Sequence, residues 1–209
     1  MIFLSDKISF PPVSVASSDG IVAIGGDLTV ERLLLAYKSG IFPWYNEGEP
    51  IVWHSPAQRM VLFPEKLKVS KSMRQLIRKG TFKVTFNTCF ADVIANCKKI
   101  LRKGQDGTWI TSEMQQAYSK LHELGIAKSV EVWLDDELVG GLYGIDLGTT
   151  FCGESMFSTV SNTSKIAFIY LAEKLQKEKY KILDCQVYTN HLASLGAEEI
   201  PRTEFLKYL

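Results

Sequence analysis

Two polar residues interrupt an apolar segment near the end of the chain, "ILDCQV" at residues 182–187. Alternation along an extended strand would place Asp184 and Gln186 on one face, with the apolar residues on the other. Polar side chains on a buried strand need partners or a function, because burying them unpaired costs free energy. A solvated sheet face is the structural alternative for these two residues.

A carboxylate lies within a second apolar segment, "TFCGESMFS" at residues 150–158. The same alternation places Glu154 and Met156 on one face of the expected strand. If the two strands are neighbours, Glu154 joins Asp184 and Gln186 in one partly apolar cleft. Clustered polar groups beside apolar side chains are typical of a functional site, so these three are the candidate catalytic residues.

Other reactive side chains form no recognisable constellation in the sequence. Four cysteines without a CxxC pair and only three histidines argue against a zinc site and a disulfide framework, and we expect no metal and no cofactor. Ser155 in "GESMF" misses the G-x-S-x-G nucleophile elbow, because Phe157 replaces the second glycine. His122 is expected on the surface, and His191 is interpreted as structural rather than catalytic.

Positive charge gathers at residues 65–83, "EKLKVSKSMRQLIRKGTFK", although the formal net charge of the chain is only +1. A solvated surface is the simpler interpretation of this run, and a phosphate-binding surface is the alternative. Trp44 and Trp109 lie in segments flanked by glycine or proline. Such tryptophans are either packing residues or platforms on which bases stack.

Length and composition are those of a globular protein. The chain has 209 residues, of which 46% are hydrophobic and 22% charged, enough to bury a core without disulfides. No segment approaches the roughly 18 consecutive apolar residues of a membrane-spanning helix, so no membrane association is expected. Balanced charge and the lack of a heptad pattern favour a monomer, and reduced buried thiols favour the cytoplasm.

Capping residues and periodicity predict the elements that must position these side chains. One helix should begin after Thr29 and end at Gly40. Further helices are expected in "FADVIANCKKILRK", "TSEMQQAYSKLHELG" and "SNTSKIAFIYLAEKLQKEK", and strands in "TFKVTF", "SVEVWLDDELVGGLYGIDLGTTFCGESMF", "YKILDCQV" and "TEFLKYL". An antiparallel meander, a helix and a strand indicate an α+β fold. A change in composition near residue 60 predicts a small N-terminal α+β domain at 1–60 and a larger domain at 61–209.

Four segments together resemble the bacterial leucyl/phenylalanyl-tRNA–protein transferase family. They are "GGDLTVERLLLAYKSGIFPW", "WHSPAQRMVLFP", "FCGESMFS" followed by "SKIAFIYL", and "DCQVYTNHLASLGAEEIPR". They occur in the order of the family and cover nearly the whole chain. The resemblance implies that residues 61–209 have a GNAT-like fold, similar to the acyl-CoA N-acyltransferases, with a mostly antiparallel sheet flanked by helices.

The resemblance also implies a reaction. The family moves leucine or phenylalanine, less often methionine, from Leu-tRNA or Phe-tRNA to the N-terminal α-amine of proteins that begin with arginine or lysine. The product is marked for degradation by the N-degron pathway. An aminoacyl ester is already activated, and an α-amine with a pKa near ~8 is partly a free nucleophile at neutral pH. The reaction therefore requires no metal, cofactor or covalent nucleophile.

The resemblance assigns roles to the candidate residues. Gln186 would accept a hydrogen bond from the attacking amine, and Asp184 would orient Gln186 and add negative potential. Glu154 would complete the cleft and favour a cationic N-terminal residue. The pocket for the transferred side chain would be formed by Phe151, Met156 and Phe168. Contacts to the tRNA would be made at the terminal adenosine by Trp44 and Trp109, and at the phosphates of the acceptor stem by Lys71, Arg74, Arg78 and Lys79.

Two departures from the family pattern, Ala57-Gln58 and Asn190, affect the expected substrate preference more than the reaction. An acetyl-CoA-dependent acetyltransferase is one alternative, but it would need a Q/R-x-x-G-x-G/A turn. The nearest segment, "RKGQDG" at residues 102–107, has its glycines misplaced. A non-catalytic RNA-binding module is the second alternative, and it leaves the polar residues of the cleft unexplained.

Overall fold

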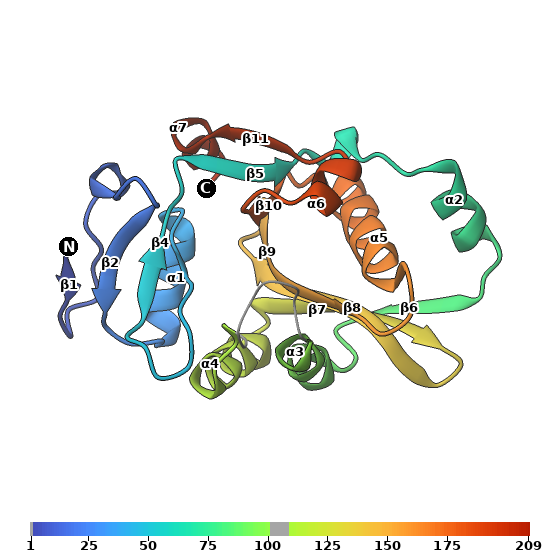
Figure 1. The fold of residues 1–209 in the computed structure, drawn as a ribbon, viewed down its shortest axis with the longest axis horizontal. Helices are drawn as coiled ribbons and strands as arrows, with labels where there is room; N and C mark the ends of the chain where they lie inside the picture. The colour runs from blue at the N-terminus through green and yellow to red at the C-terminus, as the bar shows by residue number, and fades with distance from the viewer. Residues whose placement is uncertain (1, 101–108) are drawn as a thin grey trace.

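The computed structural model describes residues 2–100 and 109–209, and these form two β-sheets (Figure 1). The smaller sheet comes from the first part of the chain and has the strand order β1-β2-β4-β3. Its elements are β1 Phe3–Leu4, β2 Ile21–Gly25, β3 Phe42–Pro43 and β4 Val52–His54, with helix α1 at Val30–Lys38. Helix α1 begins at its predicted cap, because Thr29 Oγ1 accepts a hydrogen bond from the backbone N–H of Arg32.

The larger sheet has seven described strands in the order β11-β5-β10-β9-β8-β7-β6. They are β5 Gln58–Leu62, β6 Phe82–Phe86, β7 Ala127–Leu134, β8 Glu137–Asp146, β9 Thr150–Ser158, β10 Ile182–Gln186 and β11 Glu198–Pro201. Every neighbouring pair is antiparallel except β9 and β10, which are parallel. The parallel pair is possible because helix α5 separates the two strands in sequence and crosses over between them.

Helices cover both faces of the larger sheet. Helix α5 packs on one face, and α3 and α4 pack on the other (Figure 1). The helices of this part are α2 Lys71–Arg78, α3 Phe90–Lys99, α4 Ser112–Glu123, α5 Thr163–Lys177, α6 Asn190–Ser194 and α7 Arg202–Phe205. The α+β fold class predicted from the sequence, a small N-terminal unit and a larger, mostly antiparallel sheet flanked by helices, is confirmed. Within the described residues, no helix is long and apolar enough to cross a lipid bilayer.

Local signals account for most of the boundaries. Helix α4 begins after Thr111, whose Oγ1 accepts a hydrogen bond from the backbone N–H of Met114 at 3.1 Å. The predicted Asp-Asp turn joins β7 to β8, and Asp135 there has a φ of 54°. A short polar side chain tolerates this left-handed conformation better than most residues do. Helix α5 follows Asn162, which makes no side-chain capping hydrogen bond.

Two predictions about local structure are wrong. The segment "TEFLKYL" is not a strand: after β11 the chain forms α7 and a short 3-10 helix, because this turn buries Phe205 completely against β5 and β10. His122 is not simply a surface residue, since its ring stacks on Phe90 at 4.3 Å between centroids. The misplaced-glycine segment at 102–107 and the predicted end of the helix at 101–103 lie outside the described residues.

One hydrophobic cluster spans both sheets. It includes Leu33 and Trp53 from the N-terminal part together with Val93, Tyr118 and Tyr143 from the larger part. Strand β5 already belongs to the larger sheet. The two predicted domains therefore share one core, and the boundary after residue 60 stays a prediction.

Candidate active site

Strands β9 and β10, which carry the candidate catalytic residues, lie side by side with Cys152 opposite Asp184. Both strands are irregular at the site: the β8–β9 pairing skips Glu154, and the β5–β10 pairing skips Cys185. A bulge bends its strand and turns the side chains in new directions. Between the two bulges, Gln186 Nε2 donates a hydrogen bond to Glu154 Oε1 at 2.8 Å. Glu154 and Gln186 thus lie together at one cavity, as expected, whereas the prediction that Asp184 lines the same cleft is wrong, because the bulge turns it away from the cavity into the core.

The bulge on β10 gives Gln186 an unusual backbone. Its φ is 64°, a left-handed conformation that costs a non-glycine residue roughly 1–2 kcal/mol. The backbone N–H of Gln186 donates a hydrogen bond to Asp184 Oδ1 at 2.9 Å, which offsets part of this cost. Asp184 is fully buried, whereas Gln186 lines a cavity. Asp184 therefore lies behind the cavity wall and holds Gln186 through its backbone N–H.

Asp184 is itself held by an arginine that is not among the candidate residues. Arg59 on β5 donates two hydrogen bonds to the carboxylate, from Nε to Oδ1 at 2.8 Å and from Nη2 to Oδ2 at 2.7 Å. Both side chains are almost completely excluded from solvent. The guanidinium lies between the rings of Phe42 and Phe205, with its carbon 4.7 Å from each centroid. The positive charge of Arg59 thus offsets the negative potential expected from Asp184.

Glu154 is the second carboxyl group of the site, and it is held in a different way. Tyr118 Oη donates a hydrogen bond to Glu154 Oε2 at 3.1 Å. Burial is the main cause that raises the pKa of Glu154 to about 8, and the charge of Asp184 adds to the rise. The hydroxyl groups of Tyr37 and Tyr118 and the amide of Gln186 favour the charged form of Glu154 and oppose this rise. A pKa of about 8 leaves the carboxyl group of Glu154 mostly protonated at pH 7, and the group ionises as the pH rises through 8.

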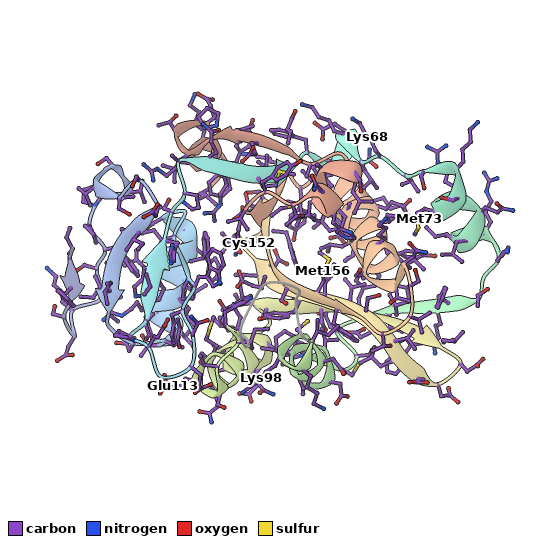
Figure 2. The ribbon with its side chains drawn as sticks, in the orientation of Figure 1. Lys68, Met73, Lys98, Glu113, Cys152 and Met156 are labelled. Carbon is purple, nitrogen blue, oxygen red and sulfur yellow. The ribbon has the colours of Figure 1, made fainter. Side chains whose placement is uncertain are left out.

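These groups open into a cavity of about 570 Å³, large enough for a side chain and a nucleoside. Its apolar wall is formed by Leu142, Met156, Phe168, Leu171, Leu183 and Leu192. Its polar residues are Glu154, Ser155, Ser164, Gln186, Thr189 and His191. Aromatic residues also line it: Phe42, Trp44, Trp109, Tyr143 and Tyr188. Met156, which belongs to β9, is labelled near the centre of the molecule in Figure 2.

The predicted pocket and adenosine residues are distributed unevenly around this cavity. Met156 and Phe168 line it, whereas Phe151 is buried in the core outside the lining that the described residues form. Trp44 lies at the rim with 38% of its surface exposed, and Trp109 is more deeply placed with 9% exposed. The N-terminal unit therefore contributes directly to the cavity through Trp44.

The basic residues are not at the cavity. Lys71, Arg74 and Arg78 lie on helix α2 and Lys79 caps it, at the end of the molecule away from β10 (Figure 1). His191, interpreted as structural, does line the cavity, and burial together with the nearby Lys165 lowers its pKa. Across residues 2–100 and 109–209, no group of three histidine, cysteine, aspartate or glutamate residues is placed to hold a metal ion.

Three residues of the site are not predicted from the sequence: Arg59, Tyr37 and Tyr118. Arg59 opens the apolar run "RMVLF", and a charge in such a run is a signal of a buried ion pair that could have been used. Tyr37 falls at helical spacing with apolar residues, a pattern that indicates only packing. Tyr118 lies in an amphipathic helix that offers no separate signal.

The chain is similar along its whole length to one protein family. The family model described as "Leucyl/phenylalanyl-tRNA protein transferase" matches residues 61–209, and the model of that family's N-terminal domain matches residues 26–57. A protein of Flavobacterium johnsoniae named leucyl/phenylalanyl-tRNA–protein transferase is 64% identical over 209 residues, covering 100% of this chain and 99% of that protein.

Solved structures match at much lower sequence identity. The crystal structure of FemX has a TM-score of 0.53 and 10% identity, covering 82% of this chain and 66% of that chain. At this identity the match shows a similar fold alone. A ribosomal-protein-alanine N-acetyltransferase from Brucella melitensis biovar Abortus 2308 matches with a TM-score of 0.36 and 16% identity, covering 49% of this chain and 77% of that chain.

The buried ion pair predicts a large loss of stability in one variant. Arg59→Met leaves Asp184 buried without its partner, so the free energy of unfolding in urea should fall by about 3–5 kcal/mol. As a control, Lys207→Ala removes an ion pair with Glu204 whose side chains are 66% and 52% exposed, and should cost less than about 1 kcal/mol. Equal losses in the two variants would contradict the structural role of the buried pair.

The raised pKa of Glu154 predicts a pH-dependent stability. Between the ordinary pKa of 4.5 and about 8, the folded protein keeps a proton that the unfolded chain has lost, so stability falls as pH rises. Glu154→Gln removes this effect. The melting temperature of the variant relative to wild type should therefore rise from pH 4.5 to 8 and level off above. Glu204→Gln, at an exposed position, is the control, and a constant difference for Glu154→Gln would count against the shift.

Proposed function

Because the chain belongs to the leucyl/phenylalanyl-tRNA–protein transferase family and is an aminoacyltransferase, we propose that it moves leucine or phenylalanine from aminoacyl-tRNA to proteins that begin with arginine or lysine. Methionine is a less frequent donor residue. The modified protein is then a substrate of the N-degron pathway. Since aminoacyl-tRNA is made in the cytoplasm, the enzyme works there.

The reaction is an aminolysis of an ester. The α-amine nitrogen of the acceptor attacks the aminoacyl carbonyl, a peptide bond forms, and the bond to the 3′ oxygen of the terminal ribose breaks. The amine loses a proton and the released 3′ oxygen gains one, so atoms and charge balance. Because the ester is already activated, holding both reactants in the reactive geometry supplies up to roughly 7–11 kcal/mol of the barrier.

One observation carries the proposal: Gln186 lines the cavity, and its amide nitrogen donates a hydrogen bond to Glu154. Its Nε2 is engaged with Glu154, so its Oε1 is the atom placed to accept a hydrogen bond from the attacking amine. An amide is far too weak a base to remove the proton outright. Gln186 therefore positions the amine, and the proton moves through water or to the leaving 3′ oxygen.

The apolar wall takes the side chain of the transferred amino acid. Met156 and Phe168 form it together with Leu171 and Leu192, and Phe151 supports it from the core. A flexible thioether suits a pocket that must fit both a branched and an aromatic side chain. An apolar pocket separates residues that differ by one methylene by only about 1–3 kcal/mol, so leucine, phenylalanine and methionine can share it.

The acceptor residue is selected by charge. Asp184 is compensated by Arg59, which leaves Glu154 as the carboxyl group on the cavity wall. An arginine or lysine side chain of the acceptor brings a positive charge close to Glu154 and favours its ionised form. This complementarity supports the preference for cationic N-terminal residues.

The tRNA is held at two places. Trp44 and Trp109 contact the terminal adenosine at the cavity, and the phosphates of the acceptor stem meet the basic side chains of Lys71, Arg74, Arg78 and Lys79. Phosphate contacts position a nucleic acid without reading its sequence, so several tRNAs that carry the right amino acid are accepted. We propose that the enzyme acts as a monomer.

A labelled-leucine assay tests the reaction, the acceptor rule and the site together. With Leu-tRNA as donor, a peptide that begins with arginine should be labelled and the same peptide beginning with alanine should not. Gln186→Ala should lower the rate about 100-fold or more, in the range of losing a group that acts in the transition state. Equal labelling of both peptides would contradict the proposed preference for acceptors that begin with arginine or lysine.

The contribution of helix α2 can be measured through salt. Replacing Lys71, Arg74, Arg78 and Lys79 by glutamine should weaken tRNA binding and flatten the dependence of log K on log salt by about one unit for each phosphate that is no longer neutralised. The rate at saturating tRNA should stay close to that of wild type. Lys120→Gln with Lys207→Gln removes exposed charges elsewhere. If this control variant flattened the dependence of log K on log salt by the same amount, the effect would come from net charge alone and not from helix α2.

A further inference from the structure

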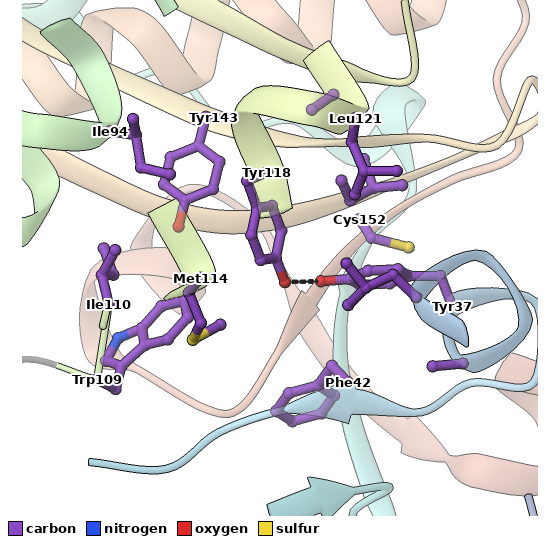
Figure 3. Packing of buried hydrophobic residues seen from close by; sticks show 14 of the residues in the cluster. Tyr37, Phe42, Ile94, Trp109, Ile110, Met114, Tyr118, Leu121, Tyr143 and Cys152 are labelled. Atoms are coloured by element: carbon purple, nitrogen blue, oxygen red, sulfur yellow. Dashed lines mark hydrogen bonds between the residues drawn. The ribbon is translucent and has the colours of Figure 1, made fainter. Parts of the chain in front are cut away.

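Hydrogen-bond donors converge on the carboxyl group of Glu154. Tyr118 Oη donates to Oε2 at 3.1 Å, and Gln186 Nε2 donates to Oε1 at 2.8 Å. The hydroxyl groups of Tyr37 and Tyr118 point at each other and are hydrogen-bonded (Figure 3). Since Tyr118 gives its proton to Glu154, its oxygen accepts the proton of Tyr37. The chain of hydrogen bonds therefore runs in one direction, from Tyr37 through Tyr118 to Glu154.

These hydrogen bonds join distant parts of the molecule in a buried setting. Tyr37 lies on α1 of the N-terminal unit, and Tyr118 lies on α4. Both side chains are at most 1% exposed, and the ring of Tyr143 packs edge-on against Tyr118. In such surroundings an unpaired hydroxyl or carboxylate is costly, so each donor keeps its acceptor. The orientation of Glu154 is thereby fixed by the protein rather than by solvent.

The protonation state of Glu154 decides whether the carbonyl oxygen or the NH₂ group of the Gln186 amide faces the cavity. A carboxylate accepts the N–H of the amide, which leaves the carbonyl oxygen turned to the cavity. A protonated carboxyl group can instead donate to the carbonyl oxygen, which turns the NH₂ group outward. An NH₂ group has no acceptor for the N–H of an incoming amine. Only the first arrangement can position the nucleophile.

We propose that Tyr118, supported by Tyr37, is a positioning residue: its O–H favours the carboxylate form of Glu154, which accepts the N–H of Gln186 and so turns the carbonyl oxygen of Gln186 to the attacking amine. This role rests on the proposed function, since it acts through Gln186. It makes helix α1 of the N-terminal unit part of the catalytic apparatus, although Tyr37 itself touches no substrate.

The charges around Glu154 give the sign of the pH effect. Asp184 on β10 raises the pKa of Glu154, and Arg59 on β5 is engaged with Asp184. Cys152 on β9 is a neutral thiol, because burial raises its pKa well above the usual range. The tyrosine hydroxyls and the Gln186 amide lower the pKa of Glu154. Loss of the Tyr118 hydroxyl therefore raises this pKa further, so Glu154 ionises only at a higher pH.

The test is the pH profile of transfer by Tyr118→Phe, with Leu-tRNA as donor and a peptide that begins with arginine as acceptor. We expect kcat at pH 7 to fall roughly 10-fold, the effect of one hydrogen bond to a charged group, while KM for both substrates changes less than about twofold. The acidic limb of the kcat profile should move to higher pH, and the loss should shrink above pH 9. Deprotonation of the acceptor amine also contributes to the acidic limb, but by the same amount in wild type and in every variant.

Two further variants make the test specific. Tyr37→Phe should shift the limb in the same direction, because the Tyr37 hydroxyl also lowers the pKa of Glu154. Tyr180→Phe removes a comparable hydroxyl, which donates to Asp146 at 2.8 Å outside the cavity, and should leave the profile unchanged. A Tyr118→Phe profile equal to wild type, or a kcat lowered equally at every pH, would overturn the positioning role. Wild-type protein that transfers no label would overturn the proposed function itself, and this role with it.

Discussion

The ion pair between Arg59 and Asp184 is the contact on which the site depends. Two opposite charges are removed from water here, which is tolerated only because the guanidinium and the carboxylate meet through two short hydrogen bonds. The same carboxylate holds the backbone of Gln186, and the same guanidinium lies against Phe42 of the N-terminal unit. One buried pair thus connects the two sheets, the bulge on β10 and the glutamine that lines the cavity.

The geometry fits a reaction that needs placement more than strong chemistry. Bulges at Glu154 and Cys185 interrupt two adjacent strands and turn polar groups into a mainly apolar cavity. In the proposed reaction, Gln186 provides a weak but firmly held hydrogen-bond acceptor, and the attack of a free amine on an activated ester requires little more. A neutral amide also avoids the strong salt bridge that a carboxylate at the same place would form with a cationic acceptor.

Glu154 connects the acid–base state of the site to the packing of the whole molecule. Its pKa of about 8 is the balance of burial against hydrogen bonds that come from α1, α4 and β10. A change in how the N-terminal unit packs on the larger sheet would alter the Tyr37–Tyr118 contact, and through it the ionisation of Glu154. Shared packing of the two parts is therefore a condition for the site as well as for stability.

The sequence by itself determined the elements and the candidate residues. Caps such as Thr29 and Thr111, the alternation of strands and the order of four family segments depend on residues close together in the chain, so they can be read without coordinates. From them followed the α+β fold, the family, and Glu154, Asp184 and Gln186 as neighbours. The same reasoning made "TEFLKYL" a strand, because nothing local shows that Phe205 is buried by a helical turn.

Tertiary structure alone decided the partners of these residues. Arg59 meets Asp184 across 125 positions of the chain, and Tyr37 meets Tyr118 across 81. Amino-acid composition and hydrophobic periodicity carry no information about such contacts, since the contacts exist only after the strands have paired and the helices have packed. The bulges at Glu154 and Cys185 likewise depend on register against β8 and β5. That register and packing settle which polar side chain is paired in the core and which one lines the cavity.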